Sequence, residues 1–393
     1  MKVIKKNPYN ISNDAAFHSN SQNIDKLPKI NITQLEILEE CILENAPNLW
    51  KNHSNLTIIT ADACRSVDNV PIHEACIVLY CLSKGFVPLS EELFPKELSC
   101  LRGKFKTDIR EGYFILGPIN MYGNLDSYND PICMGSNIGA KDGRTCGSVG
   151  LFVDLPNNAK GFITCCHVLR NCITAETHKY DTDDGDEPIQ VQQPGNSAFC
   201  GRTDTICAEL KKAKFTPNVP RVSVDAALVK LNSRIPGTGH FVIKNITQAE
   251  EAGYSQNAYP VYSSGVVHRS IGEDDIEKPL LKSGTSTGLT RSLFRLRGSQ
   301  VRIFPNGAWL GTNGENLIVM KGQYEVESCN VSKPFFSAGD SGSAVFLKEP
   351  NGQLACIGIA IGMTSYHTTV VTPIGSVLDA LELSDEDVTR FGT

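Results

Sequence analysis

The sequence lacks several features that would place it at once in a large class of proteins. It has no long apolar run, since stretches such as 355–363 are far too short to cross a bilayer. Its first residues lack the apolar segment of a secretory signal peptide. Lys and Arg form no cluster, and the formal net charge of -6 argues against a nucleic-acid-binding surface. We therefore expect a cytoplasmic protein, with a nuclear location left open, that binds neither membranes nor nucleic acids.

The 14 cysteines could suggest disulfides, but without an export signal, reduced thiols in small core positions are the better interpretation. Cys165, Cys166 and Cys172 flank His167, so a metal site has to be considered. Their spacing fits no standard zinc pattern. The acidic run at 181–187 could suggest a calcium loop, yet the other ligand positions of an EF-hand are missing. We expect no metal and no cofactor.

The N-terminal part of the chain shows two kinds of patterning. Residues 1–32 are polar and have no periodicity, which predicts a flexible tail. The sequence TQLE that follows has the form of a capping box, and apolar residues recur at helical spacing up to Pro47. Strand-like runs come next. We predict a small α/β N-terminal domain over 33–118.

The character of the sequence changes at Cys146, after which short apolar runs alternate with Gly, Asn, Asp and Pro turns. The runs lie at 148–155, 161–165, 222–230, 300–304, 316–320, 343–347 and 355–361. Many short strands at such spacing predict a mainly β fold with a pair of barrels. We assign 119–245 to a first barrel, 246–280 to a polar linker, and 281–393 to a second barrel. A helix over 373–383 ends the second barrel.

The sequence FSAGDSGSAVF at 336–346 places a serine, Ser341, in a loop of small residues just before a strand-like run. Small residues let consecutive backbone N–H groups turn toward one point beside the serine oxygen. Such a loop can supply a nucleophile together with an oxyanion hole, here the N–H groups of Gly339 and Ser341. Taken alone, the loop is equally well a turn that enters a strand.

A serine nucleophile needs a general base, and the base needs a partner that fixes its tautomer. His167 follows the strand-like run at 161–164, which predicts a place at the end of a buried strand; alone, it could be a core histidine. Asp225 opens an otherwise apolar strand, where a carboxylate is costly to bury unless it accepts strong hydrogen bonds. The alternative is an Asp that caps a turn. The chain order His167, Asp225, Ser341 predicts a catalytic triad of the kind found in chymotrypsin-type proteases.

Three segments carry a family resemblance: TCCHVL at 164–169, VDAAL at 224–228 and GDSGS at 339–343. They resemble the signatures of trypsin-like serine peptidases. More narrowly, the chain is similar to the intracellular group that includes the plant narrow-leaf protein and its bacterial relatives. Further similar segments lie at 95–98, 107–112, 147–153, 193–195 and 282–290. The chain departs from that group at Cys165-Cys166, where a small polar pair is usual, and at Thr285, where a basic residue is common.

The resemblance implies a chymotrypsin-like double β-barrel and a homo-oligomeric serine endopeptidase that acts on intracellular proteins or peptides. In such enzymes the residue six before the serine commonly lies at the base of the S1 pocket. Here it is Phe335, so we expect an apolar or small residue, not Arg or Lys, before the cleaved bond. Ala360, Ile361 and Gly362 are expected to form an uncharged pocket wall.

Two other functions stay open. The first is a catalytically weak or latent trypsin-fold module that binds peptides or serves as a scaffold. The second is a cytosolic esterase, which the absence of a Gly-x-Ser-x-Gly elbow in a βαβ setting disfavours.

Overall fold

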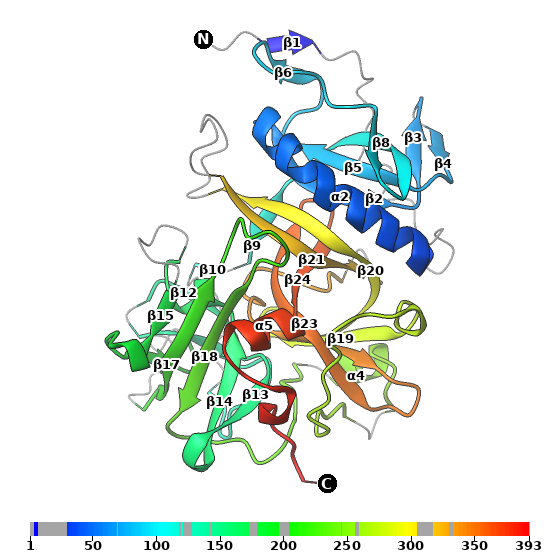
Figure 1. The fold of residues 1–393 in the computed structure, drawn as a ribbon. Helices are drawn as coiled ribbons and strands as arrows, with labels where there is room; N and C mark the ends of the chain where they lie inside the picture. Colours follow the sequence, from blue (N-terminus) through cyan, green and yellow to red (C-terminus); the bar gives the residue numbers. More distant parts are fainter. Residues whose placement is uncertain are drawn as a thin grey trace.

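The computed structural model describes most of the chain. The described residues are 4–6, 30–68, 70–117, 119–120, 128–141, 143–172, 179–195, 204–244, 246–255, 259–304, 317–329 and 333–392. Strands dominate, and they form two barrels with an α/β layer at the N-terminal end of the molecule (Figure 1). The prediction of a mainly β fold, a chymotrypsin-like double β-barrel preceded by a small α/β part, is confirmed. The tail predicted over 1–32 lies almost wholly outside the described residues, and its strand β1 (Ile4–Lys6) pairs with β6 (Phe86–Pro88).

The first barrel is a nine-stranded antiparallel sheet in the order β10-β12-β11-β16-β17-β18-β14-β13, with β15 on β17. Its strands are β10 (Ile119–Asn120), β11 (Asn137–Ala140), β12 (Thr145–Ser148), β13 (Phe152–Leu155), β14 (Ala159–Thr164), β15 (Lys179–Asp181), β16 (Ile189–Gln192), β17 (Ile206–Phe215) and β18 (Asp225–Leu231). Thr164 on β14 lies opposite Ala227 on β18. This register brings the end of β14, which leads into His167, to the beginning of β18, which is Asp225.

The second barrel closes on itself, because its first strand pairs with two others. Its strands are β19 (Pro279–Gly284), β20 (Gly288–Ile303), β21 (Ile318–Ser328), β22 (Ala344–Lys348), β23 (Leu354–Thr364) and β24 (Thr368–Pro373). They follow the order β19-β22-β23-β24-β21-β20, and β20 pairs back to β19. Helix α5 (Ile374–Ala380) follows directly, with Pro373 as its N-cap. Closure leaves few free strand edges, and the edge of β23 becomes important below.

The N-terminal layer shares a sheet with the second barrel. Ile58 on β2 (Leu56–Asp62) lies opposite Val301 on β20, so the sheet continues from β20 through β2, β5, β8 and β7. The other strands of this part of the sheet are β5 (Cys76–Cys81), β7 (Glu97–Cys100) and β8 (Gly103–Glu111), while β3 (Arg65–Val67) and β4 (Val70–Ile72) form a separate two-stranded sheet. Helix α2 (Ile32–Asn52) lies across this part of the sheet (Figure 1). The domain boundaries given above stay predictions.

Helix α2 differs from the sequence prediction at both ends. Its N-cap is Asn31, whose side chain accepts the N–H of Gln34 at 2.8 Å, and not the expected capping box. The helix also continues through Pro47. Leu49 and Trp50 beyond the proline are buried, and the Trp50 indole donates to Gln300 Oε1 at 2.9 Å. Tertiary packing of the last turn offsets the missing proline N–H, which local propensity alone does not predict.

A buried ion network joins the N-terminal layer to the second barrel. Arg110 Nη1 on β8 lies 2.6 Å from Asp62 on β2, and Arg295 Nη2 on β20 lies 3.1 Å from the same carboxylate. Arg295 also lies 3.7 Å from Glu325 on β21, whose carboxylate accepts the hydroxyl of Thr60 at 2.7 Å. Each charge therefore has a partner of opposite sign, as burial requires.

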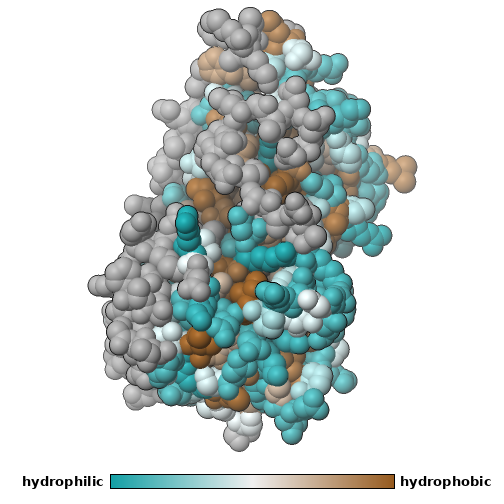
Figure 2. All heavy atoms as spheres, turned by 90° about the vertical axis from the view of Figure 1, so that its left-hand side faces the viewer, coloured by the Kyte–Doolittle hydropathy of each residue, from teal (hydrophilic) through white to brown (hydrophobic). Residues whose placement is uncertain are grey.

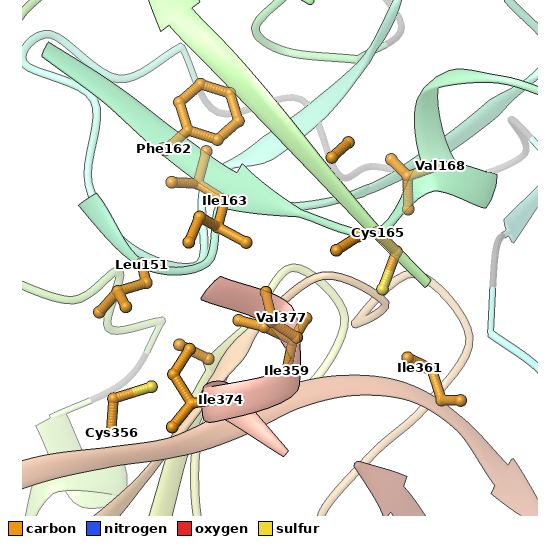
Figure 3. Close-up of a cluster of buried hydrophobic side chains, with 14 of the residues drawn as sticks. Leu151, Phe162, Ile163, Cys165, Val168, Cys356, Ile359, Ile361, Ile374 and Val377 are labelled. Atoms are coloured by element: carbon orange, nitrogen blue, oxygen red, sulfur yellow. The ribbon is translucent and has the colours of Figure 1, made fainter. Parts of the chain in front are cut away.

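Apolar side chains fill the space between the two barrels. Figure 3 shows Ile163 and Cys165 of the first barrel on the side of Ile359 on β23 and Val377 on α5, all fully buried. On the face shown in Figure 2, brown apolar patches are separated by hydrophilic side chains.

Among the described residues, no helix has the length and apolar character needed to span a membrane. The other helical segments of the described residues are η2 (Pro156–Asn158), α3 (Cys166–Leu169), η3 (Thr182–Asp184), α4 (Ile246–Glu251), η5 (Glu273–Asp275) and η7 (Asp385–Asp387).

Candidate active site

His167 and Asp225 meet inside the first barrel. His167 lies in the short helix α3, directly after β14, and Asp225 is the first residue of β18. The backbone N–H of His167 donates to Asp225 Oδ1 at 3.2 Å, and its ring Nδ1 contacts Oδ2. The side chains are only 2% and 0% exposed. Because a carboxylate can only accept, this contact places the ring proton on Nδ1 and leaves Nε2 as an acceptor.

The first barrel also holds the loop that carries Ser341. Ser148, at the end of β12, donates its N–H to the Ser341 carbonyl at 2.8 Å and its hydroxyl to the Gly339 carbonyl at 3.0 Å. Gly342 has a φ of 89°, and a Cβ built there would lie 2.7 Å from the Ser148 carbonyl oxygen. Only glycine fits at this point. The serine loop of the second barrel is thus fixed against the first.

The Ser341 hydroxyl does not contact the imidazole in this structure. It donates to the carbonyl of Ile361 at 3.2 Å, whereas Nε2 of His167 is buried without a hydrogen-bond partner among the described residues. The two segments are nevertheless neighbours, since a Cβ on Gly147 would meet both the Val168 side chain and the Ser341 carbonyl. Without a substrate, the hydrogen bond between a nucleophile and its base is often long or unmade.

The predicted oxyanion donor Gly339 already has an acceptor. Its N–H donates to the carbonyl of Gly117 at 2.6 Å. Phe335, expected at the base of the pocket, is fully buried in the core of the second barrel, and its N–H donates to Ser328 Oγ at 2.9 Å. The neighbouring Phe336, which the sequence analysis did not single out, lies closer to Gly117.

The predicted pocket wall lies on β23 beside the serine loop. The Ala360 carbonyl accepts the Gly342 N–H at 2.9 Å. Gly362 pairs with Leu116 of a short strand, β9 (Phe114–Leu116), which comes from the N-terminal part of the chain. A strand of three residues is too short to show alternation in the sequence. The strand β23, with which β9 pairs, is also distant in the sequence, so no local pattern connects the two. The sequence analysis therefore missed β9 and Gly117.

A buried ion pair lies next to the serine. Lys282 Nζ lies 3.0 Å from Asp340 Oδ2, and both side chains are 0% exposed. The carboxylate also accepts the N–H groups of Ser286 and Ser337, at 2.7 and 3.0 Å, and the Thr287 hydroxyl at 2.7 Å. Burial lowers the pKa of Lys282, and Asp340 opposes that shift. The motif at 282–290 had been noted only as a resemblance, because a sequence does not show that its lysine meets Asp340.

Cysteine and carboxylate groups near the site offer a potential metal set. The ligand atoms of Cys165, His167 and Asp225 lie within 4.8 Å of one another, as do those of Cys166, Cys172 and Asp225. Burial raises the pKa of Cys165, and a hydrogen bond with Cys166 together with burial raises that of Cys172. Metals bind thiolates, so raised thiol pKa values oppose ligation here. The cysteines of the described residues are free thiols.

No protein-family model matches the sequence, and no curated protein matches it. Several solved structures resemble its fold. Nocardiopsis protease (NAPase) is 16% identical, covers 64% of this chain and 96% of its own, and has a TM-score of 0.37. Thermobifida fusca Protease A (TFPA) is 14% identical, covers 66% of this chain and 98% of its own, and has a TM-score of 0.37. A glutamic acid specific serine protease is 13% identical, covers 64% of this chain and 98% of its own, and has a TM-score of 0.38. Similarity at these levels carries no functional argument, so the fold assignment rests on the strand order above.

Proposed function

We propose that this protein is a serine endopeptidase that hydrolyses peptide bonds of protein substrates through His167, Asp225 and Ser341. The observation that carries the proposal is the double contact between His167 and a fully buried carboxylate, which leaves Nε2 without a partner among the described residues. Burying an aspartate is costly, and a structural role alone does not require an imidazole with a free acceptor nitrogen. The serine loop next to it supplies the matching nucleophile.

In the proposed reaction the Ser341 hydroxyl rotates from Ile361 toward Nε2 of His167 and attacks the substrate carbonyl. Nε2 takes the hydroxyl proton and passes it to the leaving amine, and an acyl-enzyme remains. Water then attacks the ester and loses a proton to Nε2. Nε2 returns this proton to the Ser341 oxygen as the ester bond breaks, which releases the carboxylic acid and restores the free serine. The N–H groups of Gly339 and Ser341 stabilise the oxyanion in both steps, at about 3 kcal/mol per donor.

A fluorophosphonate probe, followed by mapping of the labelled peptide, tests the proposal. We expect labelling at Ser341, none in Ser341→Ala, and normal labelling in Ser337→Ala. Ser337 belongs to the same loop, and its contact with Asp340 uses the backbone N–H, which the substitution keeps. A folded wild-type protein that neither labels nor cleaves peptides would refute the proposal.

The alternative is a latent peptide-binding or scaffold module with a trypsin-like fold. Two contacts favour it: the hydroxyl of Ser341 donates to the Ile361 carbonyl, and the N–H of Gly339 donates to the Gly117 carbonyl. Under this alternative, Ser341 stays unreactive in every oligomeric state. The main proposal includes an intracellular location and a homo-oligomeric state. The free thiols support the intracellular location, and a molar mass from light scattering tests the homo-oligomer.

A further inference from the structure

The strand β9 lies on the edge of β23 next to Ser341. One edge of β23 pairs with β24, and on the other edge β22 reaches Ile359. Beyond this point β9 takes over, with Leu116 opposite Gly362 and Phe114 opposite Thr364, antiparallel to β23. An extended segment added to an open sheet edge is a common way for proteins to bind peptides.

Gly117, which follows β9, makes the main-chain contacts of a bound substrate. Its carbonyl oxygen accepts the N–H of Gly339, the proposed oxyanion donor, at 2.6 Å. Its own N–H donates to the carbonyl of Ile361 at 3.2 Å. A peptide whose carbonyl is attacked by Ser341 must present that carbonyl to the same donor while it pairs with the same strand. Gly117 thus occupies the position of P1, the residue before the cleaved bond.

There is no room for a side chain at this position. A Cβ on Gly117 would lie within 3.0 Å of the Phe336 ring and 2.7 Å from Ser341 Oγ. The ring cannot move away easily, because Phe336 is 2% exposed and belongs to the same buried cluster as Phe335. The space beside Gly117 that a side chain would need is filled by the protein itself.

We propose that Phe114–Gly117 is an internal substrate mimic that shields Ser341, and that the cleft selects extended apolar peptides with glycine at P1. This inference rests on the proposed peptidase function for its catalytic meaning. The apolar preference follows from β9 itself, since Phe114 is buried and Leu116 packs against the main core.

Hydrogen exchange tests whether β9 occupies the cleft, without any need for catalysis. In the wild-type chain the amides of 114–117 should exchange slowly. In Gly117→Ala, and more so in Gly117→Val, they should exchange at least about tenfold faster, because the new side chain meets Phe336. The matched control is Gly237→Ala, where an added Cβ meets nothing within 4 Å. Fast exchange at 114–117 in the wild type would overturn the proposal.

Peptide binding tests the glycine preference. The double variant Gly117→Ala/Ser341→Ala, which cannot turn over a substrate, is titrated with acetyl-Phe-Ile-Leu-Gly-amide and with the same peptide ending in Phe. We expect the glycine peptide to bind at least about tenfold more tightly. Equal binding, or tighter binding of the Phe peptide, would overturn the proposal.

Labelling of Ser341 connects the two results to catalysis. Gly117→Ala should react with a fluorophosphonate about tenfold faster than the wild type, and Gly237→Ala at the wild-type rate. If Ser341 stays unreactive in every variant while exchange and peptide binding behave as expected, the peptidase function fails and the glycine-selective cleft stands as a binding site. If Ser341 reacts equally fast in the wild type and in Gly117→Ala, the shielding is wrong and the peptidase function stands.

Discussion

The substitution Lys282→Met tests how the serine loop is held in place. In the structure Lys282 neutralises Asp340, the residue before Ser341, and both side chains are 0% exposed. Removing one member of a buried pair typically costs about 3–5 kcal/mol, because the other charge stays buried. Asp340 keeps its other hydrogen-bond donors, among them the Thr287 hydroxyl, so the lower value of about 3 kcal/mol applies. With about 2.1 cal/mol/K of unfolding entropy per residue, Tm should fall by about 4 °C.

The same substitution should slow fluorophosphonate labelling of Ser341 about 100-fold, since a displaced loop withdraws the Gly339 N–H from the oxyanion. Differential scanning calorimetry and labelling kinetics measure the two effects. Lys104→Met is the matched control: Lys104 is exposed and its pair with Glu97 is accessible to solvent, so its loss should leave Tm and labelling nearly unchanged. The double variant Lys282→Met/Asp340→Asn should be more stable than Lys282→Met, because no unpaired charge remains. If Lys282→Met labels and unfolds like the Lys104→Met control, the pair does not hold the loop.

Three further predictions concern other contacts. Asp225→Asn should lower turnover and labelling of Ser341 about 10⁴-fold with little change in Tm, since an amide no longer fixes the proton on Nδ1 of the partner histidine; near-normal kinetics would remove Asp225 from the mechanism. Burial raises the pKa of Asp62, but Arg110 and Arg295 outweigh it and lower the pKa below 3.8. The stabilisation is therefore fully present above about pH 4 and is lost as the pH falls further, so Asp62→Asn should flatten the drop of Tm in acid, and an unchanged acid limb would contradict this. Gly342→Ala should destabilise the protein by at least about 2 kcal/mol in urea unfolding, through its positive φ and contact with the first barrel; a neutral effect would show that the two barrels are not closely packed there.

Local sequence patterns correctly predicted the strands and loops whose conformation is determined by residues close together in the sequence. The strands around His167 and the strand that begins at Asp225 follow from short apolar runs between turns, and the structure contains them as β14 and β18. The loop of Ser341 follows from its small residues in the same way. The sequence pattern predicted that the helix ends near Pro47. The helix instead continues to Asn52, because burial of Leu49 and Trp50 stabilises its last turn.

Contacts between distant segments were beyond these patterns. Lys282 forms an ion pair with Asp340, and the Gly117 carbonyl accepts the N–H of Gly339. In each case nothing in the sequence of either segment indicates that it contacts the other. Periodicity reports which face of a strand is buried, but not which strand lies beside it. The orientation of the Ser341 hydroxyl likewise depends on a carbonyl that only the folded β23 brings near.

The sequence by itself determined a mainly β chain and the three residue types from which a hydrolytic site can be built, because turns, apolar alternation and small-residue loops are local properties. The tertiary structure alone decided that β9 and Gly117 lie beside Ser341, and that Phe336 leaves no space for a side chain there. The N-terminal layer and the second barrel form one sheet, so these contacts depend on which strand edges pair and which side chains pack together. Such contacts join residues far apart in the sequence, and they form only when the chain folds.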